Sequence, residues 1–549
     1  MDASSSAPEA SDAADGGGIS GPRLGPVEWL RWFWRQLTSM RTALVLLLLL
    51  AIAAVPGSLV PQRSSDPNGV AQYFADNPDL APVLDKLQLF DVYTSAWFSA
   101  IYLLLFISLV GCVIPRTKHH FDAMRAKPPR TPARLTRLPA YTDETYAGGT
   151  AGEAIEAARE LLKKQGYRVE LYQGRDGEIS VAAERGYLRE TGNLVFHVAL
   201  LGVLLAVGIG GGFGYTGQRL IVEGQTFVNS AGDYNSINPG RFFDSDSLPP
   251  YSLTLDSFDV SYEQSNLDGY GLPIDYSAHV TTRTPEGAEE KRTIRVNDPL
   301  RFEGTDVYLL ANGYAPTITV KDAAGDVVFT DSVPFLPQDA NLTSIGVVKV
   351  PDGLPEQIGM VGFFYPTAQP LDTGALTSTY PDLVLPTLSL NVYTGDLGIN
   401  DGVPRSVYSL NTDDMTQIAG RGTDVPAIEL TPGETQELPG GLGSVTFENE
   451  DPDAPNGDLS HSVHRFASFD IHSDPSQGWV LAFAIIILAG LLTSLFVPRR
   501  RVWVKAADRP DGTVFVEYGG LARGEDPGLK DAVDAIAYRH GTALGVVRP

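Results

Sequence analysis

The feature that most constrains this chain is a long apolar run near its middle. No Asp, Glu, Lys or Arg occurs between Glu190 and Arg219. A run of this length can cross the hydrocarbon core of a bilayer as an α-helix. It contains a single histidine, His197. Because a polar, metal-competent group at membrane depth is costly, His197 is the first candidate for a functional residue.

Three other stretches have a similar composition, and together the four predict an integral membrane protein with four transmembrane helices. The predicted spans are residues 42–62, 92–115, 191–214 and 475–498. Each is long enough for a membrane-crossing helix of about 20 residues, a form that satisfies the backbone hydrogen bonds in hydrocarbon. The six tryptophans lie near the ends of the spans, which is typical of the aromatic belts at a membrane surface.

The distribution of basic residues predicts which parts of the chain face the cytoplasm. Arginines precede the first span, a basic stretch follows the second at residues 116–137, and Arg499–Arg501 follow the fourth. Loops rich in Lys and Arg stay on the cytoplasmic side. We therefore expect a multi-pass protein of the plasma (cytoplasmic) membrane with both termini cytoplasmic. The loop at residues 63–91 and the long segment at residues 215–474 would then be extracytoplasmic.

The segments expected in the cytoplasm have distinct compositions. Residues 1–26 are small, acidic and glycine-rich, which predicts a disordered N-tail. Tryptophans alternate with arginines in residues 27–41, which predicts an interfacial helix, with a cation or ligand cage as the alternative. Residues 116–190 contain a basic loop, a helix and two strands, and the tail at residues 499–549 contains two strands and a helix. We predict that these pieces pack together as one small cytoplasmic α+β unit.

The segment at residues 215–474 has the pattern of a β-rich domain. Short alternating runs, such as residues 251–262 and 317–322, are separated by Gly, Pro, Asn and Asp. This pattern is typical of an antiparallel β-sandwich or a barrel-like domain. We expect a large β-rich extracytoplasmic domain. Its acidic surface fits solvation, or the docking of a basic partner.

Composition and motifs argue against several classes of function. The net charge of −25 is opposite to that of a nucleic-acid-binding surface. The single cysteine, Cys112, excludes a disulfide framework and a CxxC thiol pair. GxSxG, HExxH and P-loop motifs are absent from the sequence. The first, second and fourth spans carry no internal charges, which argues against a small-solute transporter with an ion relay.

The histidines differ in what their positions predict. We interpret several as solvated or structural because further metal ligands are lacking nearby. These are His119 and His120 in the basic loop and His461 and His464 in the β-rich segment. For His472, just before the fourth span, nothing in the sequence supports a contact with haem or lipid. For His197 two interpretations stay open. It is either hydrogen-bonded to a neighbouring helix or an axial ligand of haem iron.

Four stretches resemble the ResB (CcsB) family of cytochrome c biogenesis proteins. They read WFSAIYLLLFISLVGCVIPR in the second span, ERGYLRETGNLVFHVALLGVLL entering the third, VNDPLRFEGTDVYLLANGYAP in the β-rich segment and SLFVPRRRVWV closing the fourth. The order of spans also resembles the family pattern. The resemblance covers nearly the whole chain after about residue 27, and the blocks in the second and fourth spans are its most specific parts.

The resemblance implies a component of a System II complex for haem export and cytochrome c synthesis. Together with a ResC/CcsA-type polytopic membrane protein, it would move haem across the membrane and attach it to apocytochrome c. His197 matches a transmembrane histidine that is implicated in the family as a haem ligand, so the metal would be bound only through haem iron. The haem b would be transient and shared with the partner.

The same resemblance limits what this chain would do itself. It implies an accessory subunit of a haem lyase complex, with no catalytic residue of its own. A thioredoxin-like thiol reductant would be needed because Cys112 has no second thiol. The expected contacts are therefore the ResC/CcsA-type protein, apocytochrome c, this reductant and membrane lipid, without nucleic acid. The alternative function is a non-haem-binding membrane scaffold or chaperone that presents apocytochrome c to the partner.

Overall fold

The structure is a computed structural model that describes residues 25–174, 178–399 and 408–545. The N-tail predicted to be disordered lies almost entirely outside the described residues. The described chain divides into two compact units. One contains the residues up to Ala206 together with those from Gly478 onward, and the other is Val207–Gln477.

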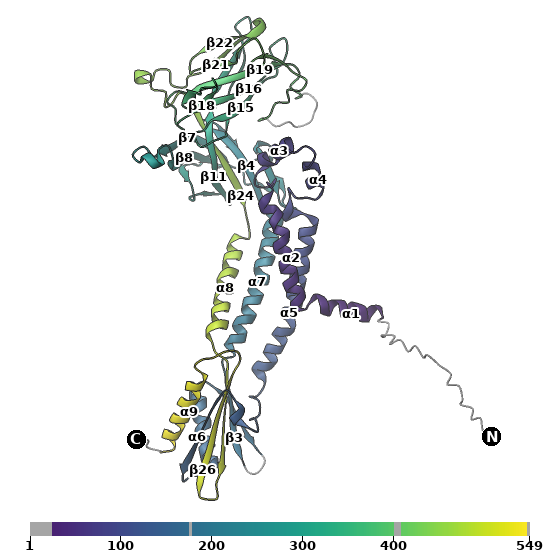
Figure 1. Ribbon diagram of the computed structural model, residues 1–549, viewed down its shortest axis with the longest axis vertical. Coiled ribbons are helices and arrows are strands. Elements are labelled where there is room, and N and C mark those ends of the chain that lie inside the picture. Colours follow the sequence, from purple (N-terminus) through teal and green to yellow (C-terminus); the bar gives the residue numbers. More distant parts are fainter. Residues whose placement is uncertain (1–24, 175–177, 400–407, 546–549) are drawn as a thin grey trace, which may run out of the picture. The chain divides into compact units, whose positions relative to one another are not determined.

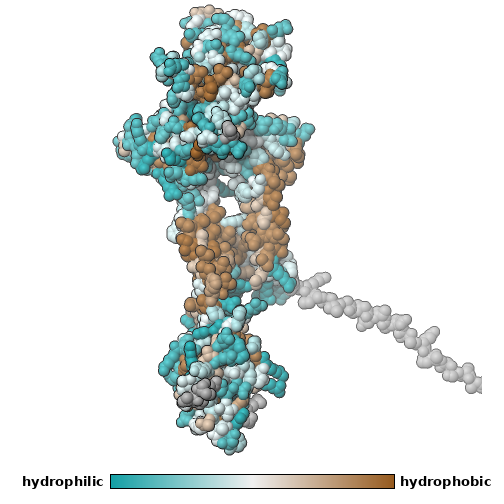
Figure 2. Space-filling model, turned by 60° about the vertical axis from the view of Figure 1, so that its left-hand side comes forward, coloured by the Kyte–Doolittle hydropathy of each residue, from teal (hydrophilic) through white to brown (hydrophobic). Residues whose placement is uncertain are grey.

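Four long apolar helices are present in the described part of the chain (Figure 1). They are α2 (Met40–Leu59), α5 (Ala96–Arg125), α7 (Leu188–Phe213) and α8 (Gln477–Phe496). Each is long and apolar enough to cross a membrane, which confirms the predicted number of spans. Hydrophobic side chains cover much of the helical surface that faces the viewer in Figure 2. Surface of this kind is suited to contact with lipid or with other membrane helices.

Helix α5 is longer than its apolar segment, which corrects one expectation. The basic residues after position 115 were expected to form a loop, but the helix continues to Arg125. His119 and His120 therefore lie on a helix. Charged residues end the apolar signal without ending helical hydrogen bonding, whereas Pro128 and Pro129 prevent the helix from continuing.

Shorter helices flank the first two long ones. Helix α1 (Pro26–Leu37) exposes Trp29, Trp32 and Trp34, as an interfacial helix would. Between α2 and α5 the chain forms α3 (Pro67–Asp76) and α4 (Ala81–Lys86). These two helices enclose a small core of Val70, Ala81 and Phe90.

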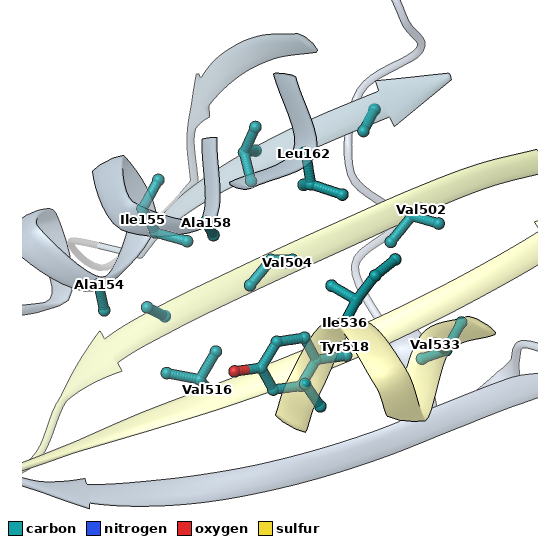
Figure 3. Packing of buried hydrophobic residues seen from close by; sticks show 14 of the residues in the cluster. Ala154, Ile155, Ala158, Leu162, Val502, Val504, Val516, Tyr518, Val533 and Ile536 are labelled. Carbon is teal, nitrogen blue, oxygen red and sulfur yellow. The ribbon is translucent and has the colours of Figure 1, made fainter. Parts of the chain in front are cut away.

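The two pieces predicted to form an α+β unit do so through one antiparallel sheet, which confirms that they pack together. The strand order is β1-β26-β25-β3-β2. The strands are β1 (Ala140–Ala147), β2 (Arg168–Gln173), β3 (Ile179–Arg185), β25 (Arg500–Asp508) and β26 (Thr513–Ala522). Helices α6 (Ala151–Lys164) and α9 (Leu529–Ala543) bury one face of this sheet. Figure 3 shows Ile155 and Leu162 of α6 and Ile536 of α9 packed over Val504 and Tyr518.

Two neighbouring inner strands of this sheet, β3 and β25, connect directly to two of the long helices. Strand β3 ends at Arg185 and α7 begins at Leu188, while α8 ends at Phe496 and β25 begins at Arg500. The strands pair with Val181 opposite Val504. At the junction, a Cβ on Gly186 would lie 2.1 Å from the carbonyl oxygen of Pro498, so only glycine fits there.

The β-rich unit contains a first pair of sheets that share one core. One sheet has the order β10-β11-β24-β4-β6 and the other β5-β7-β8-β9. Their strands are β4 (Tyr215–Val222), β5 (Thr226–Val228), β6 (Ser236–Pro239), β7 (Ser252–Tyr262), β8 (Pro273–Arg283), β9 (Glu289–Arg295), β10 (Leu300–Phe302), β11 (Thr305–Ala315) and β24 (His464–Ser473). Leu255, Val280 and Phe469 lie in their common core.

A second pair of sheets forms another sandwich in the same unit. One sheet has the order β13-β12-β23-β22, and the other has β14-β15-β16-β19-β20 with β21 paired to β19. Their strands are β12 (Thr317–Lys321), β13 (Val327–Ser332), β14 (Leu336–Pro337), β15 (Ser344–Val350), β16 (Ile358–Tyr365), β19 (Thr387–Thr394), β20 (Thr416–Ala419), β21 (Ile428–Leu430), β22 (Thr435–Leu438) and β23 (Gly443–Phe447). A separate hairpin joins β17 (Ala368–Pro370) to β18 (Leu376–Ser378). All these strand pairs are antiparallel, as the sequence pattern predicts.

Candidate functional site

An apolar cavity of about 430 Å³ lies among α2, α5 and α7, and His197 is part of its wall. This volume is within the usual range for small-molecule sites, about 300–1,000 Å³. A hydrogen bond from the hydroxyl of Tyr102 to the carbonyl oxygen of Leu204 joins α5 to α7 beside it. The lining residues are Met40, Ala43, Leu44, Leu47, Leu105, Leu109, Cys112, Val113, Arg116, Phe196, His197, Leu200, Val203 and Leu204.

The His197 ring has one nitrogen bonded to its own helix and one that remains free. Nδ1 lies 2.7 Å from the carbonyl oxygen of Asn193, one turn earlier in α7. A carbonyl oxygen only accepts hydrogen bonds, so Nδ1 carries a proton, and in the neutral imidazole Nε2 then keeps its lone pair. No described residue forms a hydrogen bond with Nε2. The ring of Phe196 meets the imidazole edge-on at 5.0 Å.

A second, polar cavity of about 800 Å³ adjoins the first. It shares three wall residues with the apolar cavity, namely Val113, Arg116 and His197. The remaining wall residues come from α5, from the start of α7 and from the basic residues around β25 and β26. They are His119, His120, Asp122, Ala123, Ala126, Glu190, Asn193, Leu194, Arg499, Arg501 and Arg523.

A buried ion network forms part of this polar wall. Arg499 is 6% exposed, and its guanidinium pairs with Glu184 at 2.6 Å and also with Glu190. Arg501 donates to the same Glu184 oxygen at 3.0 Å. Burial alone would raise the pKa of Glu184. The hydrogen bonds from both arginines outweigh it, and the pKa lies below its ordinary value. The Glu184 carboxylate is therefore ionised at neutral pH.

His120 contributes an unsatisfied buried nitrogen to the same region. Its side chain is 8% exposed, and Nε2 is 2.9 Å from the hydroxyl of Thr191. Nδ1 is buried and has no hydrogen-bond partner among the described residues, the oxygen of Glu190 being 3.8 Å away. Buried polar atoms are normally hydrogen-bonded, so this nitrogen points to a missing partner.

A model of the ResB-like family matches residues 40–534 of this chain. The chain belongs to the ResB-like family. Its curated relatives include proteins named cytochrome c biogenesis protein CcsB. The match to the protein of Prochlorococcus marinus (strain NATL1A) is 28% identical and covers 50% of this chain and 59% of the relative. The match to that of Synechococcus sp. (strain WH7803) is 29% identical and covers 50% and 58%. The matched part thus spans less than two thirds of these relatives.

Other histidines of this ResB-like chain are not among the residues that line the two cavities. His464 pairs with Glu450 at 3.2 Å, and that hydrogen bond raises the pKa of the imidazole. His472 stacks on the ring of Tyr308 with centroids 5.0 Å apart. No group of three or more His, Cys, Asp or Glu side chains is arranged to hold a metal ion within the described ranges.

His197 can be singled out from the sequence, but the residues that surround it on the polar side cannot. In the sequence, Arg116, Arg499 and Arg501 indicate only the orientation in the membrane. They reach one cavity because α5 continues beyond its apolar segment and because β25 pairs with β3. The run of arginines immediately after an apolar span was the available signal, since it places several cations at one membrane depth.

Proposed function

We propose that this chain is a component of a cytochrome c biogenesis complex. It would act with a ResC/CcsA-type partner to move haem b across the plasma membrane and attach it to apocytochrome c. Membership of the ResB-like family supports this function, as do the names of its cyanobacterial relatives. The observation that carries the haem-binding part is His197, whose free Nε2 belongs to the wall of an apolar cavity.

The residues around His197 suit a haem ligand in two ways. The Asn193 carbonyl holds the Nδ1 proton, and a metal-bound histidine usually donates its second nitrogen in this way. The cavity wall is almost entirely apolar, which matches the faces of a porphyrin. His197 would supply one axial bond to the iron of the transported haem, and the partner would supply the second.

The arrangement across the membrane is part of the proposal. The basic residues next to the spans support cytoplasmic termini, a cytoplasmic α+β unit and an extracytoplasmic β-rich region. Haem made in the cytoplasm would then reach His197 in the cytoplasmic half of the membrane. The β-rich region would position apocytochrome c and the partner. A separate thioredoxin-like reductant would keep the apocytochrome thiols reduced, because Cys112 is the only cysteine.

The test is the haem spectrum of the purified complex of this chain with its ResC/CcsA-type partner. His197→Ala should lose most of the bound haem and abolish cytochrome c maturation. His197→Gly should regain its spectrum when imidazole is added, because free imidazole can replace the missing ligand but not a missing packing contact. His279→Ala, at a half-exposed histidine of the β-rich region, is the matched control.

The second candidate function is a scaffold that presents apocytochrome c without binding haem. The multi-sheet β-rich region favours it, because such a surface is large enough to hold an extended polypeptide. Full haem content and normal cytochrome c maturation in His197→Ala would establish this alternative and reject the ligand role.

A further inference from the structure

We propose that the polar cavity is a carboxylate site, in which Arg116 and Arg501 bind the acidic side chains of the tetrapyrrole whose ring occupies the apolar cavity. This inference rests on the proposed function. It assigns a ligand chemistry to residues that the His197 hypothesis does not use. It also gives the α+β unit a role, since that unit supplies Arg501.

The two cavities meet at His197. Val113, Arg116 and His197 line both of them. Arg116 is the only Arg, Lys, Asp or Glu in the wall of the apolar cavity, whereas four arginines line the polar one. A molecule held at His197 therefore has an apolar environment on one side and a cationic one on the other. This suits an amphiphile with an apolar body and an acidic edge.

The arginines of the polar cavity differ in whether they are available to a ligand. Arg499 is already neutralised because it pairs with Glu184 and Glu190. Arg116, by contrast, forms no ion pair with any described residue, and its guanidinium contacts the sulfur of Met40 at 2.6 Å. The charge of Arg116 is thus not neutralised by a carboxylate, so Arg116 can form a new ion pair with an anionic ligand in the polar cavity.

Arg501 is available in a similar way. It uses only Nε to bind Glu184, at 3.0 Å, and its side chain is 40% exposed. Its two terminal nitrogens have no hydrogen-bond partner in the part of the chain that the structure describes. A guanidinium binds a carboxylate through two parallel hydrogen bonds, so each of these two arginines can hold one acidic group.

His120 has an unsatisfied nitrogen in the same cavity. This residue lines the polar cavity, is more than nine-tenths buried and leaves Nδ1 without a partner. The Thr191 hydrogen bond holds its other nitrogen in place. A ligand oxygen, or a water molecule that the ligand orders, would supply the missing hydrogen bond. This observation is independent of the charge argument and points to the same cavity.

A phosphate of an anionic lipid would offer these arginines a similar charge. We favour the carboxylates of a tetrapyrrole over a lipid phosphate, because His197, which can bind a metal ion, lines both cavities. The two sources differ in one respect that an experiment can use. Carboxylates of a porphyrin can be esterified, which removes their charge while the ring remains the same.

The test compares metal-free protoporphyrin IX with its dimethyl ester, using the complex of the full chain with its partner in detergent. Porphyrin fluorescence on titration measures both affinities. Omitting the metal removes any contribution of axial ligation. The diacid should bind at least tenfold more tightly than the diester. Arg116→Gln and Arg501→Gln should each reduce this preference several-fold, and the double variant should remove it. Arg159→Gln, at a surface arginine paired with Glu156, should preserve it.

The outcomes separate this inference from the proposed function. His197→Ala should keep the preference for the diacid, because metal-free porphyrin does not use the imidazole. Equal affinities for diacid and diester in the unaltered protein would overturn the carboxylate site even if His197 proves to be a haem ligand. The inference also fails if the arginine variants lose bound phosphatidylglycerol, measured by native mass spectrometry, but keep the porphyrin preference.

Discussion

Gly192 of α7 and Gly490 of α8 face each other across a contact that leaves no room for a side chain. A Cβ on Gly192 would lie 2.7 Å from the carbonyl oxygen of Gly490, and a Cβ on Gly490 would lie 2.8 Å from that of Gly192. Small residues at such crossings let the backbones of two membrane helices approach closely.

Gly490→Ala should therefore destabilise the helix pair, by about 1–3 kcal/mol, as expected for an overpacked contact. Thermal unfolding in detergent, followed by size-exclusion chromatography with fluorescence detection, measures the effect. Gly478→Ala is the matched control on the same helix, because a Cβ there meets nothing within 4 Å. An unchanged unfolding temperature in Gly490→Ala would show that the helices do not pack at this point.

Glu184→Gln should be strongly destabilising because it leaves the buried Arg499 with one carboxylate partner fewer. Breaking a buried ion pair from one side costs about 3–5 kcal/mol. The exposed pair of Lys127 with Glu170 is the comparison, and Lys127→Gln should leave the unfolding temperature nearly unchanged. Similar unfolding temperatures for both variants would contradict the importance of the buried network.

Deleting residues 502–549 should expose the rest of the α+β unit to protease. The deletion removes most of β25 and all of β26 and α9. Strand β1 then loses its only strand partner, and β3 loses one of its two. Limited trypsin digestion should then cleave within residues 140–185, which the intact protein protects. Removing only residues 546–549 is the control. Unchanged protection after the larger deletion would mean that the first piece folds without the second.

The stability of the α+β unit should fall as the pH decreases below neutrality, because of His540. The hydroxyl of Tyr518 donates to Nδ1 at 2.6 Å, and Nε2 donates to the carbonyl oxygen of Ala154 at 2.7 Å. Burial lowers the pKa of His540 from its ordinary value of 6.5. The unfolded state therefore binds a proton first, and folding stability decreases from about pH 6.5 down to the folded pKa.

The expected loss is at most about 1.4 kcal/mol per pH unit in that window. Hydrogen–deuterium exchange of β26 and α6, corrected for intrinsic rates, measures it. His540→Leu should be less stable at pH 7, since Tyr518 and Ala154 lose a partner, but should lack this pH dependence. If wild type and variant respond equally to pH, another group is responsible.

The proposed orientation predicts opposite accessibility for two engineered cysteines. In a Cys112→Ser background, Glu286→Cys in the β-rich unit should react with a membrane-impermeant maleimide added to intact cells. Glu160→Cys on α6 should react only after the membrane is opened. Both positions are exposed, so side-chain burial does not confound the comparison. The reverse pattern would invert the topology.

An element of the fold can be predicted from the sequence when neighbouring residues alone specify it. The four long helices follow from long apolar runs that lack Asp, Glu, Lys and Arg, and His197 stands out because it is the histidine within one of these runs. Strand β1 was missed because its sequence, AYTDETYA, is largely polar, and only pairing with β26 identifies it as a strand.

The polar half of the candidate site was unpredictable for a different reason. Glu184 and Arg499 are 315 residues apart and meet only because β3 pairs with β25. Similarly, α5 places His120 beside Thr191 only because the helix continues past its apolar segment. Contacts of this kind depend on strand register and helix length, which composition does not determine.

The direct junctions of β3 with α7 and of β25 with α8 have a further consequence. Only a few residues separate each strand from its helix. The register between β3 and β25 therefore fixes the position of α7 relative to α8 along the helix axes. A slip of two residues between these strands keeps every side chain on its own face. It would nevertheless displace one helix along the other by roughly 7 Å, since a strand rises about 3.4 Å per residue. The register of the α+β sheet, which lies outside the apolar spans, thus determines the position of His197 relative to α8.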